Sequence, residues 1–514
     1  MYDTNEQNTW RNISRHEESF NDLLYLQLKK TPWWLISIAF HGVLVFLLFA
    51  IPMGSGPGLG DAQLNSSLNE DMIDDLKEEV KPEIEDEKPI EQEEKEMEDP
   101  TIKDAKVSDH NETDNDMPFE ESLGEEGISD APFEGPSTNA AIGIGGGAGG
   151  AFGGRGGHRN LKAMGGGKAT EGAVDLGLEW LKNHQDPEGF WDCDGFMAQC
   201  NLNQCDGAGY ALYDPGVSGL ALLAFLGAGE THKHGRYKKV VKNGLKYLKQ
   251  IQDPEGCFGP RTTNHFTYNH AIGALAMAEA YALTASPLFK QSAQQAIDFI
   301  HKAQNPYLAW RYGVRPGDND TSVTGWMVMA LKSAKAAKLR VDQTGFDGVM
   351  AWLEKATEPE YGRVGYTSRG TPPARPQDLM DKFPSDKSES LTAVGILSRI
   401  FCGDDPRKSE MVGKGTDLCL KTLPVWDDAS GSIDMYYWYY GTLAIFQVGG
   451  ESWKKWNVAI QGAIIDQQRK EGDEKGSWDP IGPWGRDGGR VYSTAVCVMC
   501  MEVYYRYARV FGTK

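Results

Sequence analysis

From residue 168 to the C-terminus, the sequence alternates between two kinds of helical segment. One kind is amphipathic, with apolar residues at helical spacing and charged residues between them, as in residues 236–251. The other kind is apolar on nearly every side, as in residues 267–283, and such a helix is buried among other helices. The alternation predicts an outer, half-exposed ring of helices around an inner, buried ring.

Six outer and inner pairs follow one another. The outer segments are 169–184, 236–251, 287–303, 342–356, 409–422 and 452–469. The inner segments are 216–228, 267–283, 321–337, 388–401, 435–448 and 491–507. Repeated hairpins bury a continuous core only by stacking on their neighbours, and six of them favour closure. We therefore expect residues 168–514 to form an all-α (α/α)6 toroid of six helical hairpins.

The outer segments end in a recurring phrase. Gln185-Asp186-Pro187-Glu188-Gly189-Phe190-Trp191 ends the first, and residues 252–259 repeat it. Weaker copies run from Gln304 to Trp310 and from Gln468 to Trp478. Proline stops the helix and glycine permits the turn. We expect the glutamine and the aromatic residue to tie each turn to the next outer helix.

This Gln-x-x-x-Gly-x-Trp phrase resembles the repeat of the squalene–hopene cyclases and protein prenyltransferases. The resemblance covers residues 168–514 and implies a terpenoid cyclase-like toroid with a polyprenyl or triterpene-type ligand in its centre. Bacterial squalene cyclases protonate an alkene with an acid in an Asp-x-Asp-Asp-Thr-Ala phrase. The nearest match is residues 317–322, where Asn319 replaces the central acid and leaves Asp318 and Asp320 as candidates. Alternatively, Asp318 or Asp320 caps the helix that begins at Thr321.

The prenyltransferases hold zinc near an Asp-x-Cys phrase that opens an inner helix, and no inner segment of this chain opens that way. We therefore expect neither a metal nor another cofactor in the toroid. Cys193, Cys200 and Cys205 do lie close together in the sequence, but their spacing is not a standard zinc pattern. Outside the cytoplasm Cys200 and Cys205, or Cys193 with one of them, could form a disulfide, with a metal site as the alternative.

Aromatic and polar residues gather where inner segments begin. In a toroid these starts meet at one end of the central cavity, so the residues would line a ligand pocket. The alternative is simple packing of the end loops. His270 and Tyr268 are the acid–base candidates by residue type. The candidate ligand-binding residues are His265, Trp310, Tyr312, Tyr436, Tyr437, Trp438, Tyr440, Trp478 and Trp484.

The chain before the toroid has a different composition. Between Asp61 and Glu134 there are 28 acidic residues and 6 lysines, a charge of −22, while the whole chain carries −21. The remainder is nearly neutral, and no basic block suggests nucleic acid. We expect residues 54–142 to be an acidic, disordered tether. Residues 143–167 contain 13 glycines and read as a flexible linker.

Residues 33–53 form an apolar run of 21 residues, which is long enough to span a bilayer. The expected transmembrane helix is 32–53, and a signal peptide is the competing interpretation. Basic residues precede the run, whereas the first lysine after it is Lys77. The positive-inside rule then leaves residues 1–31 in the cytoplasm and the C-terminal domain outside it, in the periplasm of a Gram-negative-type cell.

Three functions are compatible with these features. The first is an extracytoplasmic toroid that binds or transforms a polyprenyl or other apolar ligand, without the usual cyclase acid. The second is a non-enzymatic scaffold that binds an envelope protein or polymer. A third is a polysaccharide lyase or hydrolase on an α/α toroid. An aromatic cavity favours the first, and a cleft with paired carboxylates favours the third.

Overall fold

A computed structural model of the chain describes residues 165–201 and 204–506. The outer helices are α3 (Lys168–Asn183), α5 (Lys238–Gln250), α7 (Pro287–Ala303), α9 (Gln343–Ala356), α11 (Glu410–Lys421) and α13 (Gly450–Ile464). The inner helices are α4 (Asp214–Gly227), α6 (Phe266–Thr284), α8 (Thr321–Ala336), α10 (Ser390–Cys402), α12 (Met435–Val448) and α14 (Gly485–Met501). A short α15 (Val503–Arg506) follows, and the described residues contain no β-strand.

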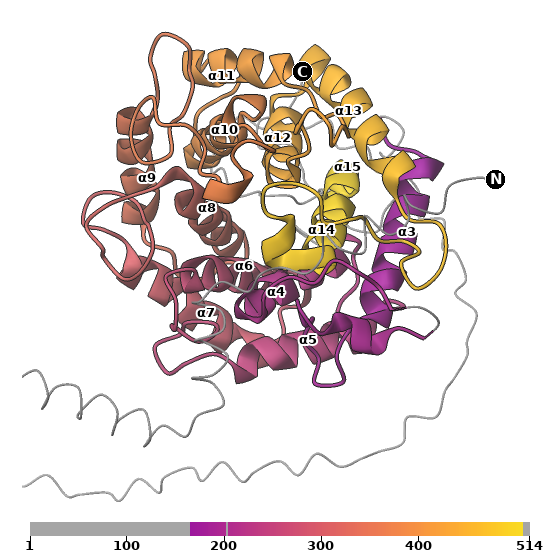
Figure 1. The fold of residues 1–514 in the computed structure, drawn as a ribbon. Helices are drawn as coiled ribbons and strands as arrows, with labels where there is room; N and C mark the ends of the chain where they lie inside the picture. Colours follow the sequence, from indigo (N-terminus) through magenta and orange to yellow (C-terminus); the bar gives the residue numbers. More distant parts are fainter. Residues whose placement is uncertain (1–164, 202–203, 507–514) are drawn as a thin grey trace, which may run out of the picture. The chain divides into compact units, whose positions relative to one another are not determined.

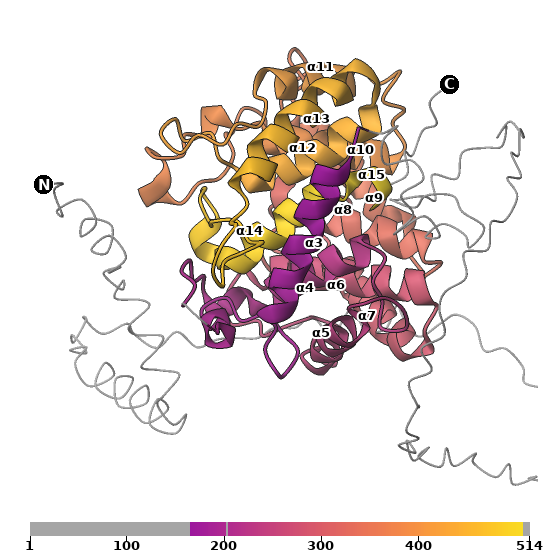
Figure 2. The same ribbon diagram turned by 90° about the vertical axis from the view of Figure 1, so that its right-hand side faces the viewer.

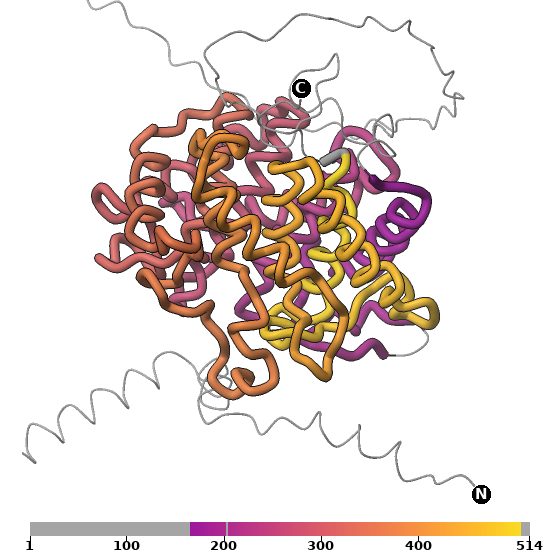
Figure 3. The backbone as a smooth tube through the Cα atoms, turned by 90° about the horizontal axis from the view of Figure 1, so that it is seen from above, coloured from indigo at the N-terminus to yellow at the C-terminus, as the bar shows by residue number. Residues whose placement is uncertain are grey.

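The inner helices form a closed ring. Each packs against the next from α4 to α14, and α14 packs in turn against α4 (Figure 1). The outer helices surround this inner ring. Helix α3 contacts both α14 and α4, so it covers the seam where the ring closes. Figures 2 and 3 show the same arrangement from the side and from above. The predicted toroid of six helical hairpins is confirmed.

Burial follows the two sequence patterns. Helix α4 is buried at every position from Pro215 to Gly227, as expected for a helix that is apolar on all sides. Helix α5 buries only Val241, Gly244, Leu245 and Leu248, which share one face. The charged face of α5 remains outside. Hydrophobic periodicity therefore separates the inner ring from the outer ring along the chain.

The recurring glutamine links neighbouring hairpins as predicted. The Gln185 side-chain amide donates hydrogen bonds to the carbonyl oxygens of Gly189, 2.9 Å away, and of Val240, 3.0 Å away in α5. Gln252 and Gln304 make the equivalent pair of bonds to the next turn and the next outer helix. The amide of Gln468 donates to Ala173 in α3 and so joins the last hairpin to the first.

The tryptophan of the phrase has a different partner from the one expected. The indole N–H of Trp191 donates to the carbonyl of Leu181, 2.7 Å away, in the outer helix that precedes it. Trp310 and Trp478 bond in the same way to the ends of α7 and α13. The glutamine therefore reaches forward to the next hairpin, and the tryptophan holds the hairpin to which it belongs.

The last inner helix begins earlier than its apolar pattern predicts. Helix α14 starts at Gly485 but is broken at Gly489, where φ is 65°. The backbone of Gly209 packs so closely there that a side chain at Gly489 would collide with it. Next to the break, the N–H of Arg490 donates to the carbonyl of Gly207. The hydrophobic pattern does not predict this break, because a neighbouring loop imposes it.

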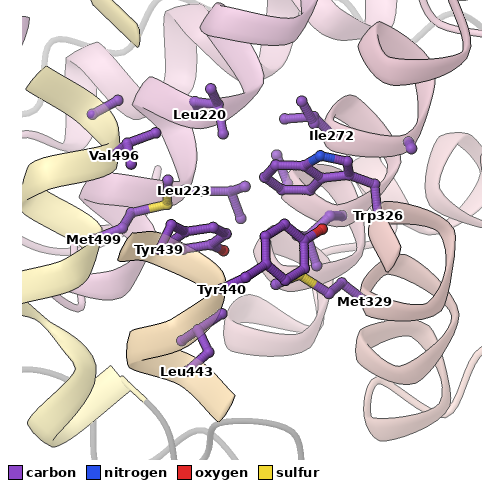
Figure 4. Packing of buried hydrophobic residues seen from close by; sticks show 14 of the residues in the cluster. Leu220, Leu223, Ile272, Trp326, Met329, Tyr439, Tyr440, Leu443, Val496 and Met499 are labelled. Atoms are coloured by element: carbon purple, nitrogen blue, oxygen red, sulfur yellow. The ribbon is translucent and has the colours of Figure 1, made fainter. Parts of the chain in front are cut away.

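Buried side chains fill part of the centre of the ring. Figure 4 shows Leu223 of α4, Met329 of α8, Leu443 of α12 and Met499 of α14 in the space between these helices, where they belong to one buried cluster. Trp326 and Tyr439 stack beside them, with ring centroids 5.6 Å apart. Since this core closes one part of the axis, a ligand site is confined to the remaining end.

The N-terminal predictions fall outside the described residues. These are the cytoplasmic segment 1–31, the transmembrane helix 32–53, the tether 54–142 and all of the linker 143–167 before Gly165. Among the helices that the structure describes, none combines the length and apolar character needed to cross a membrane.

Candidate functional site

A cavity opens at the end of the toroid where the inner helices begin. It encloses about 930 Å³, including the space at its mouth. Each of the six inner helices contributes a residue from its first turns, namely Gly216, Tyr268, Ser322, Ser390, Tyr436 and Asp487. Leu220, Ile272 and Trp326 line it next to the filled core of Figure 4. The expected meeting of the inner-helix starts around one pocket is therefore present.

The wall of the cavity is mostly aromatic and apolar. Six of its 22 lining residues are tyrosines and two are tryptophans. Arg375 and Asp487 are the lining residues with full charges. A wall of this kind favours an apolar ligand, with a few polar groups to orient it.

Several of the tyrosine hydroxyls are paired with one another. The Tyr268 hydroxyl donates to the Ser322 hydroxyl, 3.1 Å away, and the Ser322 and Tyr436 hydroxyl oxygens lie 2.8 Å apart. The hydroxyl oxygens of Tyr312 and Tyr366 are 2.7 Å apart. Burial raises the pKa of Tyr268 and of Tyr436, so both phenols stay protonated at neutral pH. They act as hydrogen-bonding groups and not as bases.

Four other side-chain atoms of wall residues are buried without a hydrogen-bond partner among the described residues. Two are the Asn269 carbonyl oxygen and the Ser390 hydroxyl oxygen, and the two aromatic donors are the indole N–H of Trp484 and the hydroxyl of Tyr492. A buried donor without a partner costs about 1–3 kcal/mol. Both aromatic donors lie where a polar atom of a bound molecule could satisfy them.

Arg375 is neutralised by a buried ion pair. Its guanidinium lies 2.7 Å from a carboxylate oxygen of Asp434, and both side chains are almost fully buried. The other Asp434 oxygen accepts the backbone N–H of Tyr437 and caps α12. Because the pair is fixed at both ends, Arg375 does not present an uncompensated positive charge to the cavity.

The convergence of six helix N-termini adds partial positive charge to this end of the ring. Acidic residues at the helix starts offset it. Asp320 caps α8, Asp434 caps α12, Glu389 precedes α10, and Asp487 lies in the first turn of α14. Three of these acids are themselves paired with an arginine, Asp320 with Arg311, Glu389 with Arg363 and Asp434 with Arg375.

The two acids suggested by the cyclase-like phrase do not line the cavity. Asp318 is exposed and pairs with Arg311. Asp320 is buried, and one of its oxygens accepts the backbone N–H of Val323, 2.7 Å away, as an N-cap. Its other oxygen lies 3.7 Å from Arg311, and burial raises its pKa to about 7. Both placements agree with the capping alternative more closely than with contact to a ligand.

Asn319, the residue that stands between Asp318 and Asp320 in this phrase, has structural contacts. Its side-chain oxygen accepts hydrogen bonds from the Asn305 side-chain amide, 3.1 Å away, and from the Ala309 N–H, 2.9 Å away. These bonds hold the turn that leads into α8. Asn319 is 6 % exposed, and its side-chain oxygen is already used in these structural hydrogen bonds.

Asp487 is the carboxyl group that lines the cavity, and sequence reasoning missed it. Burial raises its pKa to about 6, against the lowering effect of Arg486. It stands in the glycine-rich stretch 485–489, which matches no catalytic motif. Tyr366 and Arg375 were missed for a related reason, because both come from the long loop between α9 and α10.

The predicted ligand-binding residues divide into two groups. His265, Tyr268, Tyr312, Tyr436 and Trp484 line the cavity. The others are buried in the packing around it and do not reach it. These are Trp310 and Trp478, which hold their outer helices; Tyr437, which donates to the carbonyl of Thr422; Trp438, which packs on Trp426; and Tyr440, which packs on Trp326. Their large apolar surfaces are used by the core.

His270 also lies away from the cavity. Its Nδ1 accepts the backbone N–H of Phe258, 3.2 Å away, so the proton is on Nε2, which donates to the carbonyl of Ala296. Burial lowers its pKa to about 3. Both ring nitrogens of this neutral histidine are hydrogen-bonded to backbone groups, so neither can exchange a proton with a ligand. This placement differs from the expected acid–base role.

Cys193, Cys200 and Cys205 lie in the loop that joins α3 to α4. Cys193 is buried, and the Cys200 and Cys205 sulfurs are 3.1 Å apart as thiols. None of the three lines the cavity.

No family model and no curated protein matches this chain. Solved structures do match it at low similarity. The type II terpene cyclase MstE from Scytonema shares 12% identity over 66% of this chain and 97% of its own, with a TM-score of 0.43. The GH76A alpha-1,6-mannanase from a Salegentibacter species shares 13% over 66% and 99%, with a TM-score of 0.43. Cellobiose 2-epimerase from Bacillus thermoamylovorans shares 13% over 65% and 98%, with a TM-score of 0.44. The toroidal fold itself follows from the helix packing described above.

Proposed function

We propose that the cavity of this toroid binds an apolar, isoprenoid-type molecule such as a polyprenyl chain or a triterpene. The observation that carries the proposal is the wall itself, which is mostly apolar or aromatic, has eight tyrosines and tryptophans among its 22 lining residues, and in which Arg375 is already paired with Asp434. Aromatic faces bury hydrocarbon, and they also stabilise a cation that forms on it. The resemblance of the Gln-x-x-x-Gly-x-Trp phrase to the cyclase and prenyltransferase repeat supports the same ligand class.

The polar groups of the wall suit one polar end on such a ligand. The unpartnered Trp484 indole and Tyr492 hydroxyl could donate to a hydroxyl or carbonyl oxygen. Asp487 is the carboxyl group of the wall, and it is the proton donor that we assign if a bound alkene is protonated. The polysaccharide alternative is less favoured, since Asp487 has no second carboxyl beside it in the cavity wall.

Ligands retained by the purified protein provide the test. The full chain would be purified, extracted with organic solvent and analysed by mass spectrometry. The cavity variant is Ala374→Trp, which adds bulk to the wall from a loop position. The control is Val458→Trp, which adds the same side chain at a position 75% exposed on α13.

We expect an isoprenoid lipid to be enriched in the wild type and in Val458→Trp, and to be lost from Ala374→Trp. Equal lipid in all three proteins would contradict the proposal, because it would be bound outside the cavity. Retention of an oligosaccharide in its place would favour the lyase or hydrolase alternative.

The cellular arrangement is a separate proposal. We infer that residues 33–53 anchor the chain in the membrane and leave the toroid outside the cytoplasm, where it meets membrane isoprenoids or an envelope protein. The observation behind it is the distribution of basic residues around the apolar run. A reporter that is active only in the periplasm, fused after Lys514, should be active. A silent reporter, with a cytoplasmic reporter active at the same position, would reverse the orientation.

A further inference from the structure

A second cluster of reactive side chains lies at the end of α3, outside the central cavity. His184 is the residue that ends this helix, and its Nδ1 lies 2.8 Å from the carbonyl oxygen of Trp180. That contact requires the proton on Nδ1, so the lone pair is on Nε2. The ring stacks on Trp180 with centroids 4.1 Å apart and meets the edge of Phe196. His184 is therefore held in one tautomer and one orientation.

The Nε2 of His184 points at two cysteines. It lies 3.6 Å from the Cys200 sulfur and 3.5 Å from the Cys205 sulfur, and the sulfurs are 3.1 Å apart. In a tetrahedral zinc site with Zn–S of about 2.3 Å and Zn–N of about 2.0 Å, nitrogen and sulfur are about 3.5 Å apart and two sulfurs about 3.8 Å apart. Both nitrogen–sulfur distances agree, and the sulfurs need to separate by about 0.7 Å.

The surroundings of the cluster favour a metal over the disulfide expected from the sequence. The backbone N–H of Cys205 donates to the Cys200 sulfur, 3.3 Å away, which stabilises a thiolate. The bond from His184 to Trp180 is the outer contact that metal-binding histidines usually make. A disulfide would use the two sulfurs and give no role to the oriented Nε2.

We propose that His184, Cys200 and Cys205 bind one zinc ion. Soft thiolates with an imidazole are the donor set that zinc prefers. Each thiol releases its proton on binding, and the histidine binds as the neutral ring. His184 also lines a surface depression together with Asn201 and Asp473, from which water or a carboxylate can supply a fourth ligand.

The position of the cluster indicates a structural role. The loop that carries Cys200 and Cys205 continues into Asp206 and Gly207, whose carbonyls accept hydrogen bonds from the Arg490 side chain and N–H in α14. The metal would thus join the end of the first outer helix to a loop that is fixed on the last inner helix. That is the seam at which the ring closes.

The test measures metal content and does not depend on any activity. The full chain is purified with a non-chelating reductant, and bound metals are quantified by mass spectrometry. We expect about one zinc per chain, and its loss in Cys205→Ser and in His184→Gln. The control is Cys193→Ser, which removes a buried thiol from the same loop outside the triad and should keep the zinc. Zinc retained by both triad variants would contradict the assignment.

A second measurement covers the case in which a triad variant fails to fold. Cobalt added to the metal-free wild type should produce the thiolate-to-cobalt charge-transfer absorption, and a strong zinc chelator should lower the melting temperature. Absence of zinc, no cobalt absorption and no chelator effect would overturn the proposal. A stable disulfide would also overturn it. In that case, protein purified without reductant would have two fewer free thiols, peptide mapping would show Cys200 linked to Cys205, and the reduced protein would not bind zinc.

Discussion

The side-chain amide of Gln468 donates a 2.8 Å hydrogen bond to the backbone carbonyl of Ala173, 295 residues earlier in the chain. A second bond, to the carbonyl of Gly476, fixes the turn in which Gln468 stands. The same two bonds recur at Gln304 within the ring. The last turn is therefore bonded to the first outer helix in the same way as the turn at Gln304 is bonded to the outer helix that follows it.

Replacing Gln468 should cost as much stability as replacing an equivalent glutamine elsewhere in the ring. Gln468→Ala removes two bonds and leaves carbonyls unpaired, which we expect to lower the free energy of unfolding by about 2 kcal/mol. Gln304→Ala is the matched control, because the two side chains are 7% and 8% exposed. Urea unfolding of both variants checks this. A near-neutral Gln468→Ala beside a destabilised Gln304→Ala would mean that the ring is open in solution.

The Arg375–Asp434 pair should be costly to break on one side alone. Arg375→Met leaves a buried carboxylate without its partner, and we expect a loss of about 3–5 kcal/mol. Asp434→Asn in the same protein removes the charge and keeps a side chain that can cap α12. The double variant should therefore recover much of the loss. A double-mutant cycle by denaturant unfolding measures this coupling, and additive losses would show that the pair is not coupled.

His270 should make the protein less stable in mild acid. Burial lowers its folded pKa to about 3 from 6.5, so the unfolded chain binds a proton that the folded protein refuses. The stability contribution is complete above pH 6.5 and falls as the pH drops toward 3. Between pH 7 and pH 5 this group alone should remove about 2 kcal/mol. The His270→Asn variant should show a pH dependence that is shallower by that amount in unfolding experiments at the two pH values.

Tyr492→Phe should separate ligand retention from folding. Its hydroxyl is buried without a partner among the described residues, so its removal is expected to leave the melting temperature unchanged or slightly higher. A ligand whose polar end accepts from this hydroxyl should be retained less, by about threefold to tenfold, as one hydrogen bond is worth about 1 kcal/mol. Lipid extraction compared with wild type measures the change. Unchanged retention would remove Tyr492 from the binding role.

The ring could be predicted because its signals are local and repeated. The apolar faces of α4 and α6 and the Gln–Gly–Trp phrase are each readable within about twenty residues of sequence. Closure followed from counting six hairpins. The break at Gly489 could not be predicted, because the backbone of Gly209 imposes it from nearly three hundred residues away.

The cavity could be predicted only in part. Tyr268 and Tyr436 stand at inner-helix starts, and that position alone places them on the wall. Trp310 and Trp478 are also aromatic and stand shortly before inner helices, but their indole N–H groups donate to backbone carbonyls inside the packing. Arg375 and Tyr366 reach the wall from a loop whose path no periodicity describes. Residue type indicates what a side chain can do, and its neighbours decide whether it is available.

The two ends of the toroidal domain meet on one helix. The carbonyl of Gly165 accepts hydrogen bonds from the Asn457 and Gln461 side chains of α13, and the hydroxyl of Tyr504 contacts the same two side chains. Because the ends of the ring are adjacent, the fold does not require any particular hairpin to stand first in the sequence. A circularly permuted gene, with the old ends joined by a short linker and new ends cut into an exposed loop such as the one before α11, should therefore encode the same fold.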